Sequence, residues 1–106
     1  MFLHCIGSES KGNCYLLVAD DGEVLVIEAG INFKEVKKAL GFDLSGVVGC
    51  IVGHRHFDHS KYITEFTRAG IEVYCNMDTI EAMNLKSNHR VTMYNETVFS
   101  LGSFTI

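Results

Sequence analysis

The segment His54–His59 is the feature that most restricts the fold of this chain, because it holds three of the five histidines and the carboxylate of Asp58. It follows Val47–Val52, an apolar run broken only by Gly49 and typical of a strand buried on both faces. Side chains that carry chemistry collect at the carboxyl ends of strands in α/β sheets. The order of these two segments therefore predicts an α/β fold with a functional site where the strand ends.

The residue types in this segment indicate a metal site. Neutral imidazole and carboxylate are the usual nitrogen and oxygen ligands of Zn²⁺ and related divalent ions. In an extended segment, residues two apart project to the same side, so His54 and His56 are placed to hold one ion. A following turn into a helix would bring Asp58 and His59 to a second position beside the first. The alternative is a solvated histidine-rich loop in which Asp58 caps a helix, but four ligand-type residues at fixed offsets favour the metal.

The rest of the chain predicts strands first and then helices that alternate with strands. Residues 20–22 (Asp-Asp-Gly) are a hairpin signal, and Asn32 is expected to cap the first helix. Asp78 with Glu81 is expected to cap the last one. Strands are expected at residues 1–6, 14–19, 24–27, 47–52, 71–75, 91–93, 98–101 and 104–106, and helices at 32–40, 59–69 and 78–85.

Composition sets the class of protein. The 106 residues (11.8 kDa) suffice for one domain, residues 1–106, and 47% apolar with 21% charged residues disfavours disorder. A net charge of −4 argues against nucleic-acid binding through bulk charge, although a bound metal would create a local phosphate site. No basic segment precedes an apolar stretch at the N-terminus, and no apolar run approaches the roughly 20 residues of a membrane span, so a cytoplasmic protein without membrane contact is expected.

Residues with ligand chemistry outside the segment are expected to be structural. His4 lies on the first expected strand without ligand-type neighbours, and His89, in a polar loop, is the only histidine after the segment. The cysteines are expected to be small buried hydrophobic residues without disulfides, since the chain does not resemble a secreted protein. They are Cys5, Cys14, Cys50 and Cys75.

Three stretches of the sequence resemble one family. His54-x-His56-x-Asp58-His59 matches the H-x-H-x-D-H signature of the metallo-β-lactamase superfamily. Residues 7–17 (GSESKGNCYLL) are similar to the opening hairpin of its branch of bacterial and phage DNA-exonuclease-like metallohydrolases, and residues 26–30 (VIEAG) resemble a strand end that usually reads Leu-Ile-Asp-Ala-Gly. The resemblance implies an αββα sandwich built from two similar halves, of which this chain supplies the N-terminal half or a truncated domain.

The resemblance also implies roles for individual residues. His54 and His56 would bind the first metal and Asp58 and His59 the second, with Zn²⁺ expected, Mn²⁺ or Fe²⁺ as alternatives, and two ions in a complete site. Asp58 would be the catalytic residue that orients the bridging water. Glu28, in place of the usual Asp, would hydrogen-bond a ligand histidine from behind; the alternative is a carboxylate exposed at a strand end. Substrate-binding residues stay unassigned.

Other family features have no counterpart here. Complete members draw a third histidine for the first metal, a bridging Asp and a further histidine from later segments, and His89 does not match any of these motifs. Ser8, Ser10 and Asn13 would lie at the rim of the cleft, where ordinary turn chemistry is the expected role.

The resemblance leads to two expectations for function. The first is a metal-dependent hydrolase that cleaves phosphodiester bonds in nucleic acid with a metal-bound hydroxide. The second is a truncated, non-catalytic half-domain that acts through homodimerisation or association with a partner. Half of a sandwich would leave one apolar sheet face uncovered, and such faces drive association, so a homodimer through this face is predicted.

Overall fold

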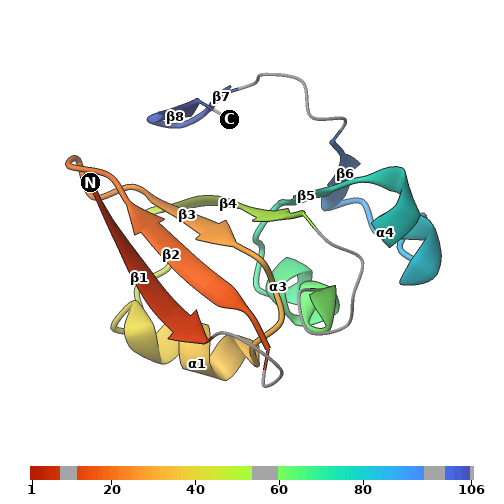
Figure 1. Ribbon diagram of the computed structural model, residues 1–106, viewed down its shortest axis with the longest axis horizontal. Helices are drawn as coiled ribbons and strands as arrows, with labels where there is room; N and C mark the ends of the chain where they lie inside the picture. Colours follow the sequence, from red (N-terminus) through yellow and green to blue (C-terminus); the bar gives the residue numbers. More distant parts are fainter. Residues whose placement is uncertain (8–11, 54–59, 95–99, 106) are drawn as a thin grey trace.

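The protein contains a six-stranded mixed sheet in the order β1-β2-β3-β4-β5-β6, seen in a computed structural model that describes residues 1–7, 12–53, 60–94 and 100–105 (Figure 1). The first three strands pair antiparallel and the last four pair parallel. The sheet strands are β1 Phe2–Gly7, β2 Cys14–Val18, β3 Val24–Ile27, β4 Val47–Val52, β5 Val73–Cys75 and β6 Val91–Met93. The expected α/β class is confirmed.

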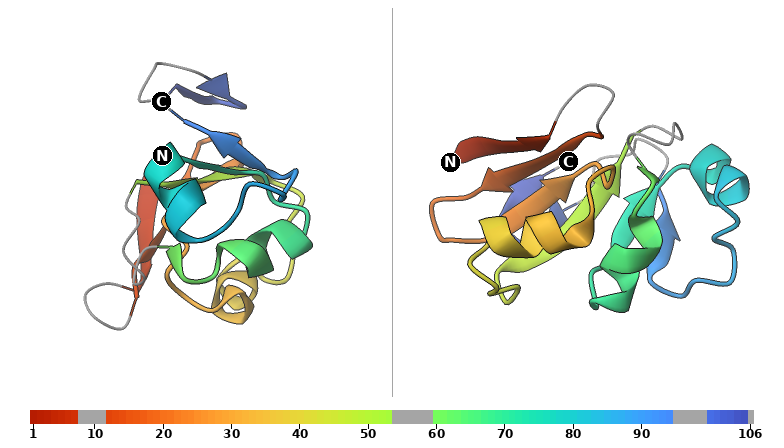
Figure 2. Two further views of the ribbon diagram at one scale, coloured as in Figure 1. Left: turned by 90° about the vertical axis from the view of Figure 1, so that its right-hand side faces the viewer. Right: turned by 90° about the horizontal axis from the view of Figure 1, so that it is seen from below.

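Three helices and a small hairpin complete the described fold. The helices are α1 Phe33–Ala39, α3 Ile63–Arg68 and α4 Met77–Ala82, and the hairpin pairs β7 Ser100–Leu101 with β8 Phe104–Thr105. Helices α1 and α3 lie against one face of the sheet, whereas the hairpin lies on the opposite face (Figures 1 and 2). Among the described residues, no helix has the length and apolarity that a membrane crossing requires.

The larger core lies between the sheet and the helices. Leu16, Val26, Cys50 and Val73 stand side by side across four neighbouring strands, and each is at most 1% exposed. Phe66 of α3 closes this layer from the helix side and packs edge-on against another buried ring, that of Phe33, at 4.9 Å between centroids. The alternation of side chains along each strand explains why these residues share one face.

The hairpin covers part of the other sheet face. Phe104 and Leu25 are buried there, and Leu101 packs beside them. Gly49 makes this approach possible, because a Cβ at this position would lie 3.3 Å from Cδ1 of Leu101 and 3.2 Å from Cε1 of Tyr74.

Two of the three helix starts can be compared with expectation, and one of them differs. Helix α1 follows its cap Asn32, whose side chain accepts the Lys34 N–H at 2.9 Å, as the sequence predicts. Helix α3 spans Ile63–Arg68 and Ser60 before it is also helical, while the start expected near residue 59 lies outside the described residues. The expected cap Asp78 is wrong. The Asn76 side chain accepts the Thr79 N–H at 2.9 Å instead, and α4 starts at Met77, directly after Asn76.

Candidate metal-site edge

The candidate site lies where the parallel strands β3 and β4 end. Their last paired residues are Ile27 and Ile51, and the Glu28 N–H continues the ladder by donating to the Ile51 carbonyl at 2.8 Å. Glu28 has a φ of 69°, a left-handed conformation that is strained for a residue with a long side chain. The chain therefore turns sharply at the end of β3, and this turn directs the Glu28 side chain toward the end of β4.

The Glu28 side chain holds the start of the histidine segment. It is 6% exposed, and its Oε1 accepts the backbone N–H of Gly53 at 2.9 Å. Gly53 immediately precedes His54, and a Cβ at Gly53 would lie 3.2 Å from the same oxygen. The alternative of an exposed strand-end carboxylate is wrong. The described contact is to the backbone before the histidines; a bond from Glu28 to a ligand histidine stays a prediction.

The residues after the histidine segment pack against the turn that follows β3. Ser60 is fully buried, and the Tyr62 N–H donates to the carbonyl of Ala29 at 2.8 Å. The two sides of the segment therefore rest on consecutive residues, Glu28 before it and Ala29 after it. Tyr62 is the N-cap of α3, so this bond gives an acceptor outside the helix to one of the first N–H groups of α3.

The loop between β1 and β2 packs against this turn. The Gly30 N–H donates to the carbonyl of Asn13 at 2.9 Å, and Asn13 is 7% exposed. Gly12 has a φ of 116°, and a Cβ there would lie 2.1 Å from the Gly30 carbonyl oxygen. No other residue fits at this approach, so Gly12 brings the loop onto the candidate site. Asn13 thus has a structural backbone role at the edge of the site.

Three thiols lie behind this edge but are poor candidates for ligands. Burial and the nearby Glu28 charge raise the pKa of Cys14 to about 12, and burial raises the pKa of Cys75 to about 11. Burial also raises the pKa of Cys50 well above its usual value. Metal binding needs the thiolate form, so these thiols act as small apolar core residues, as expected. Cys5 is exposed on β1, which corrects the expectation that all the cysteines are buried.

The proposed metal ligands themselves lie outside the described residues. His54, His56, Asp58 and His59 belong to residues 54–59, and the rim residues Ser8 and Ser10 to residues 8–11. Within the described ranges, no group of three or more His, Cys, Asp and Glu residues is placed to hold a metal. His4 and His89 are both exposed.

Sequence reasoning missed the contacts that frame the segment. Gly53 and Gly30 are small residues beside the motif and could have signalled close backbone approach. The bond from Tyr62 to Ala29 has no such signal, because a backbone donor and a backbone acceptor can belong to any residue type.

The described fold is a mixed α/β sheet with helices on one face, and the histidine-rich segment of the sequence follows the inner parallel strand β4. The family model of the metallo-beta-lactamase superfamily matches residues 7–87. The chain belongs to this superfamily, whose members are mostly metal-dependent hydrolases that bind divalent metals, usually zinc. No match is found among curated proteins.

Solved structures agree on the fold. The BLEG-1 B3 metallo-beta-lactamase has a TM-score of 0.72 at 19% identity, covering 98% of this chain and 58% of that chain. A metallo-beta-lactamase from Pontibacter korlensis has a TM-score of 0.62 at 19% identity, covering 95% and 57%. A peroxy diiron species of the chemotaxis sensor ODP has a TM-score of 0.73 at 17% identity, covering 95% and 44%. The chain thus spans about half the length of these proteins.

Proposed function

We propose that this chain is the metal-binding half of a hydrolase that cleaves phosphodiester bonds in nucleic acid. The observation that carries the proposal is the support on both sides of the histidine segment, from the Glu28 side chain to Gly53 and from Tyr62 to Ala29. Such support restricts where the intervening ligands can lie, and a catalytic metal needs ligands held in place before it binds.

The donor set suits a divalent transition metal. Three imidazoles and one carboxylate match Zn²⁺, with Mn²⁺ or Fe²⁺ as alternatives. His54 and His56 would hold a first ion, and Asp58 and His59 a second. A bound ion supplies Lewis-acid chemistry, which polarises the scissile bond and acidifies water. Asp58 would orient the attacking water, and Glu28 would keep the start of the segment against the sheet.

Metal content tests the ligand assignment. The purified protein is dialysed against trace Zn²⁺, and bound metal is measured by elemental analysis beside the variant His54→Ala/His56→Ala. The matched control is His4→Ala/His89→Ala, which removes two exposed histidines. Loss of metal in the first variant and retention in the second is expected. Equal metal content in all three proteins would remove the assignment.

Turnover tests the reaction class. Hydrolysis of bis(p-nitrophenyl) phosphate with added Mn²⁺ or Zn²⁺ is expected for the wild type and is expected to be lost in Asp58→Ala. The control is Asp78→Ala, which removes an exposed carboxylate of α4 and should keep the activity. Because two of the three solved structures described above are metallo-beta-lactamases, nitrocefin is tested in parallel. Cleavage of nitrocefin without cleavage of the phosphodiester would replace the proposed substrate class.

A second candidate is a half-domain that acts through self-association. The register places Tyr15, Ile27, Ile51 and Tyr74 in one row across the sheet face that carries the hairpin, and all four are half-buried. The row holds no charged side chain. Two copies, each of net charge −4, can therefore meet there without like charges facing each other. We propose a second copy of this chain as the cover of this row.

A further inference from the structure

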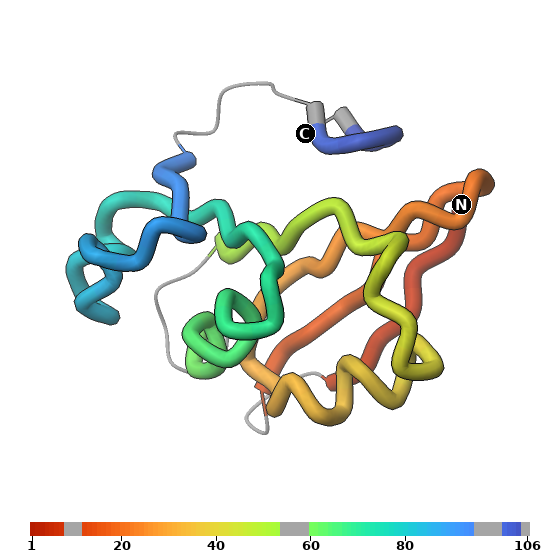
Figure 3. The backbone as a smooth tube through the Cα atoms, turned by 180° about the vertical axis from the view of Figure 1, so that it is seen from behind, coloured from red at the N-terminus to blue at the C-terminus, as the bar shows by residue number. Residues whose placement is uncertain are grey.

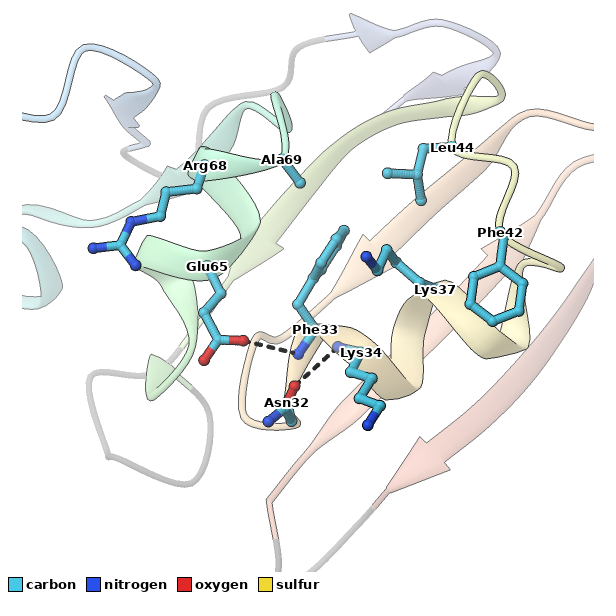
Figure 4. Close-up of a pocket in the computed structure, with 9 residues that line it drawn as sticks. All are labelled: Asn32, Phe33, Lys34, Lys37, Phe42, Leu44, Glu65, Arg68 and Ala69. Carbon is cyan, nitrogen blue, oxygen red and sulfur yellow. Dashed lines mark hydrogen bonds between the residues drawn. The ribbon is translucent and has the colours of Figure 1, made fainter.

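An open groove runs between α1 and α3 on the helix side of the molecule. It has a volume of about 660 Å³. The two helices that bound it lie on the other side of the sheet from the β7–β8 hairpin (Figure 3). Phe33 and Leu44 supply apolar surface, and Figure 4 shows charged side chains around them. The lining residues are Asn32, Phe33, Lys34, Lys37, Phe42, Leu44, Glu65, Arg68 and Ala69.

Three cations line this groove in a chain that is acidic as a whole. Within the described part of the chain, the ion pairs are those of the N-terminal amine with Asp20, Lys38 with Glu35 and Arg90 with Glu72. Lys34, Lys37 and Arg68 have no ion-pair partner there. The one carboxylate of the lining, Glu65, is directed at the backbone, since its Oε1 accepts the Phe33 N–H at 3.4 Å. The groove is therefore a local positive site on a molecule of net charge −4.

Phe42 adds an exposed aromatic ring to one end of the groove. Its N–H closes the end of α1 by donating to the Lys37 carbonyl at 2.8 Å, while Gly41 donates to Lys38 at 3.1 Å. This closure needs a left-handed turn, and Phe42 has a φ of 64°, which strains a bulky residue. The ring nevertheless stays 70% exposed, so packing within the chain does not account for it. Strained backbone occurs at ligand-contact sites in proteins, and the exposed ring can stack on a ligand.

The other end of the groove leads toward the candidate metal site. Asn32 lines that end and lies four residues after Glu28. Glu65, also in the lining, belongs to the first turn of α3, which starts directly after the Tyr62 bond to Ala29. A linear ligand in the groove would therefore extend from the edge that carries the histidine segment toward Phe42.

We propose that this groove binds the backbone of a single-stranded nucleic acid, with phosphates at Lys34, Lys37 and Arg68 and a base stacked on Phe42. Cations along a groove, combined with an exposed aromatic ring, are the features by which proteins hold single strands without reading sequence. An acidic peptide would satisfy the cations but would leave the exposed ring without a stacking partner. The proposal rests on the proposed function for the choice of substrate, yet binding in the groove does not require the histidine segment.

Fluorescence anisotropy of a labelled oligothymidylate of about twelve nucleotides tests the proposal. The metal-loaded protein is used, and the probe is recovered and checked for intact length. Three phosphate contacts predict a slope of about −2 for log K against log[salt], since each contact on a single strand contributes about −0.7. In Lys34→Gln/Lys37→Gln, which lacks two of the three contacts, the slope should become shallower and approach about −0.7. Adding Arg68→Gln to this variant should remove the remaining contribution of about −0.7. Phe42→Ala should weaken binding about tenfold, with Phe42→Leu showing the same loss because it cannot stack.

The controls separate this proposal from the proposed function. Lys38→Gln/Lys86→Gln removes two cations outside the groove and should leave the slope unchanged. His54→Ala/His56→Ala should keep oligonucleotide binding. Binding without turnover by the metal-loaded wild type would overturn the proposed reaction and leave the groove proposal standing. An unchanged salt slope in the lysine and arginine variants would overturn the proposal that this groove binds the oligonucleotide. Displacement by an oligoglutamate peptide of equal charge, as effective as displacement by unlabelled oligothymidylate, would overturn nucleic acid in favour of an acidic peptide.

Discussion

At the scale of single residues, the four cysteines differ in exposure although they share one chemistry. Cys14, Cys50 and Cys75 are buried, and burial raises the pKa of each thiol, so at neutral pH they are protonated as well as inaccessible. Cys5 is exposed on β1. A thiol reagent is expected to label one site in the native protein and four after unfolding. Cys5→Ser should abolish native labelling; rapid labelling of that variant would contradict the described core.

Glu28 is expected to contribute to stability through its bond to Gly53. Glu28→Ala leaves the Gly53 N–H without this acceptor and should lower the free energy of unfolding by about 1–3 kcal/mol. Glu28→Gln keeps an amide oxygen at the same place and should lose much less. Urea denaturation of the three proteins measures the difference. Equal midpoints for wild type and Glu28→Ala would mean that the bond contributes nothing.

At the scale of elements, the sequence predicted structure best where local signals decide it. Asn32 before α1 and Gly41 after it are capping signals within one segment, and both ends of α1 agree with them. The Tyr62 N–H before α3 bonds to the Ala29 carbonyl, more than thirty residues earlier, so no local pattern contains this contact. For α4, Asn76 and Asp78 are both good caps, and only the fold selects the first.

The attachment of the β7–β8 hairpin also depends on a glycine within the hairpin itself. Gly102 has a φ of 54°, and a Cβ there would lie 2.7 Å from the Glu23 carboxylate and 2.8 Å from Cγ1 of Val48. Gly102→Ala is therefore expected to displace the hairpin and expose Leu25, which Phe104 now covers. Increased binding of the dye ANS without loss of far-ultraviolet circular dichroism would report this change. The exposed Gly70→Ala also replaces a left-handed glycine, at φ 90°, but has open space and should not expose this face.

A second contact of the hairpin, from Ser103 to Asp21, is expected to weaken at acid pH. The Ser103 hydroxyl donates to Asp21, and this bond, with that from the Glu23 N–H, holds the pKa of Asp21 below its usual 3.8. A carboxyl whose pKa is lower in the folded state stabilises that state fully above its unfolded pKa, and the contribution is lost as pH falls through the lower folded value. Carboxyl ¹³C titration should show a midpoint below 3.8 that rises in Ser103→Ala. A midpoint unchanged by Ser103→Ala would rule out the contact.

At the scale of the whole molecule, the sequence predicted the family, which the family model confirms, and an edge of the sheet for the metal site, which stays a prediction. The H-x-H-x-D-H signature is a local pattern, and strand ends gather at one edge by topology, so both follow from short segments. The groove between α1 and α3 could not be predicted in this way. Lys34 and Arg68 belong to helices separated by β4, and only the packed sheet brings them to one surface.

Assembly is the last prediction at this scale. Pairing through the row Tyr15, Ile27, Ile51 and Tyr74 would bury half-exposed apolar side chains and leave the groove between α1 and α3 open, because the two lie on opposite faces of the sheet. Light scattering at micromolar concentration is therefore expected to give twice the chain mass of 11.8 kDa. Ile51→Lys places a charge in the centre of the row and should return the mass to 11.8 kDa, whereas Met77→Lys, at an exposed position of α4, should not. A compact wild-type monomer would exclude a second copy as the cover of this face.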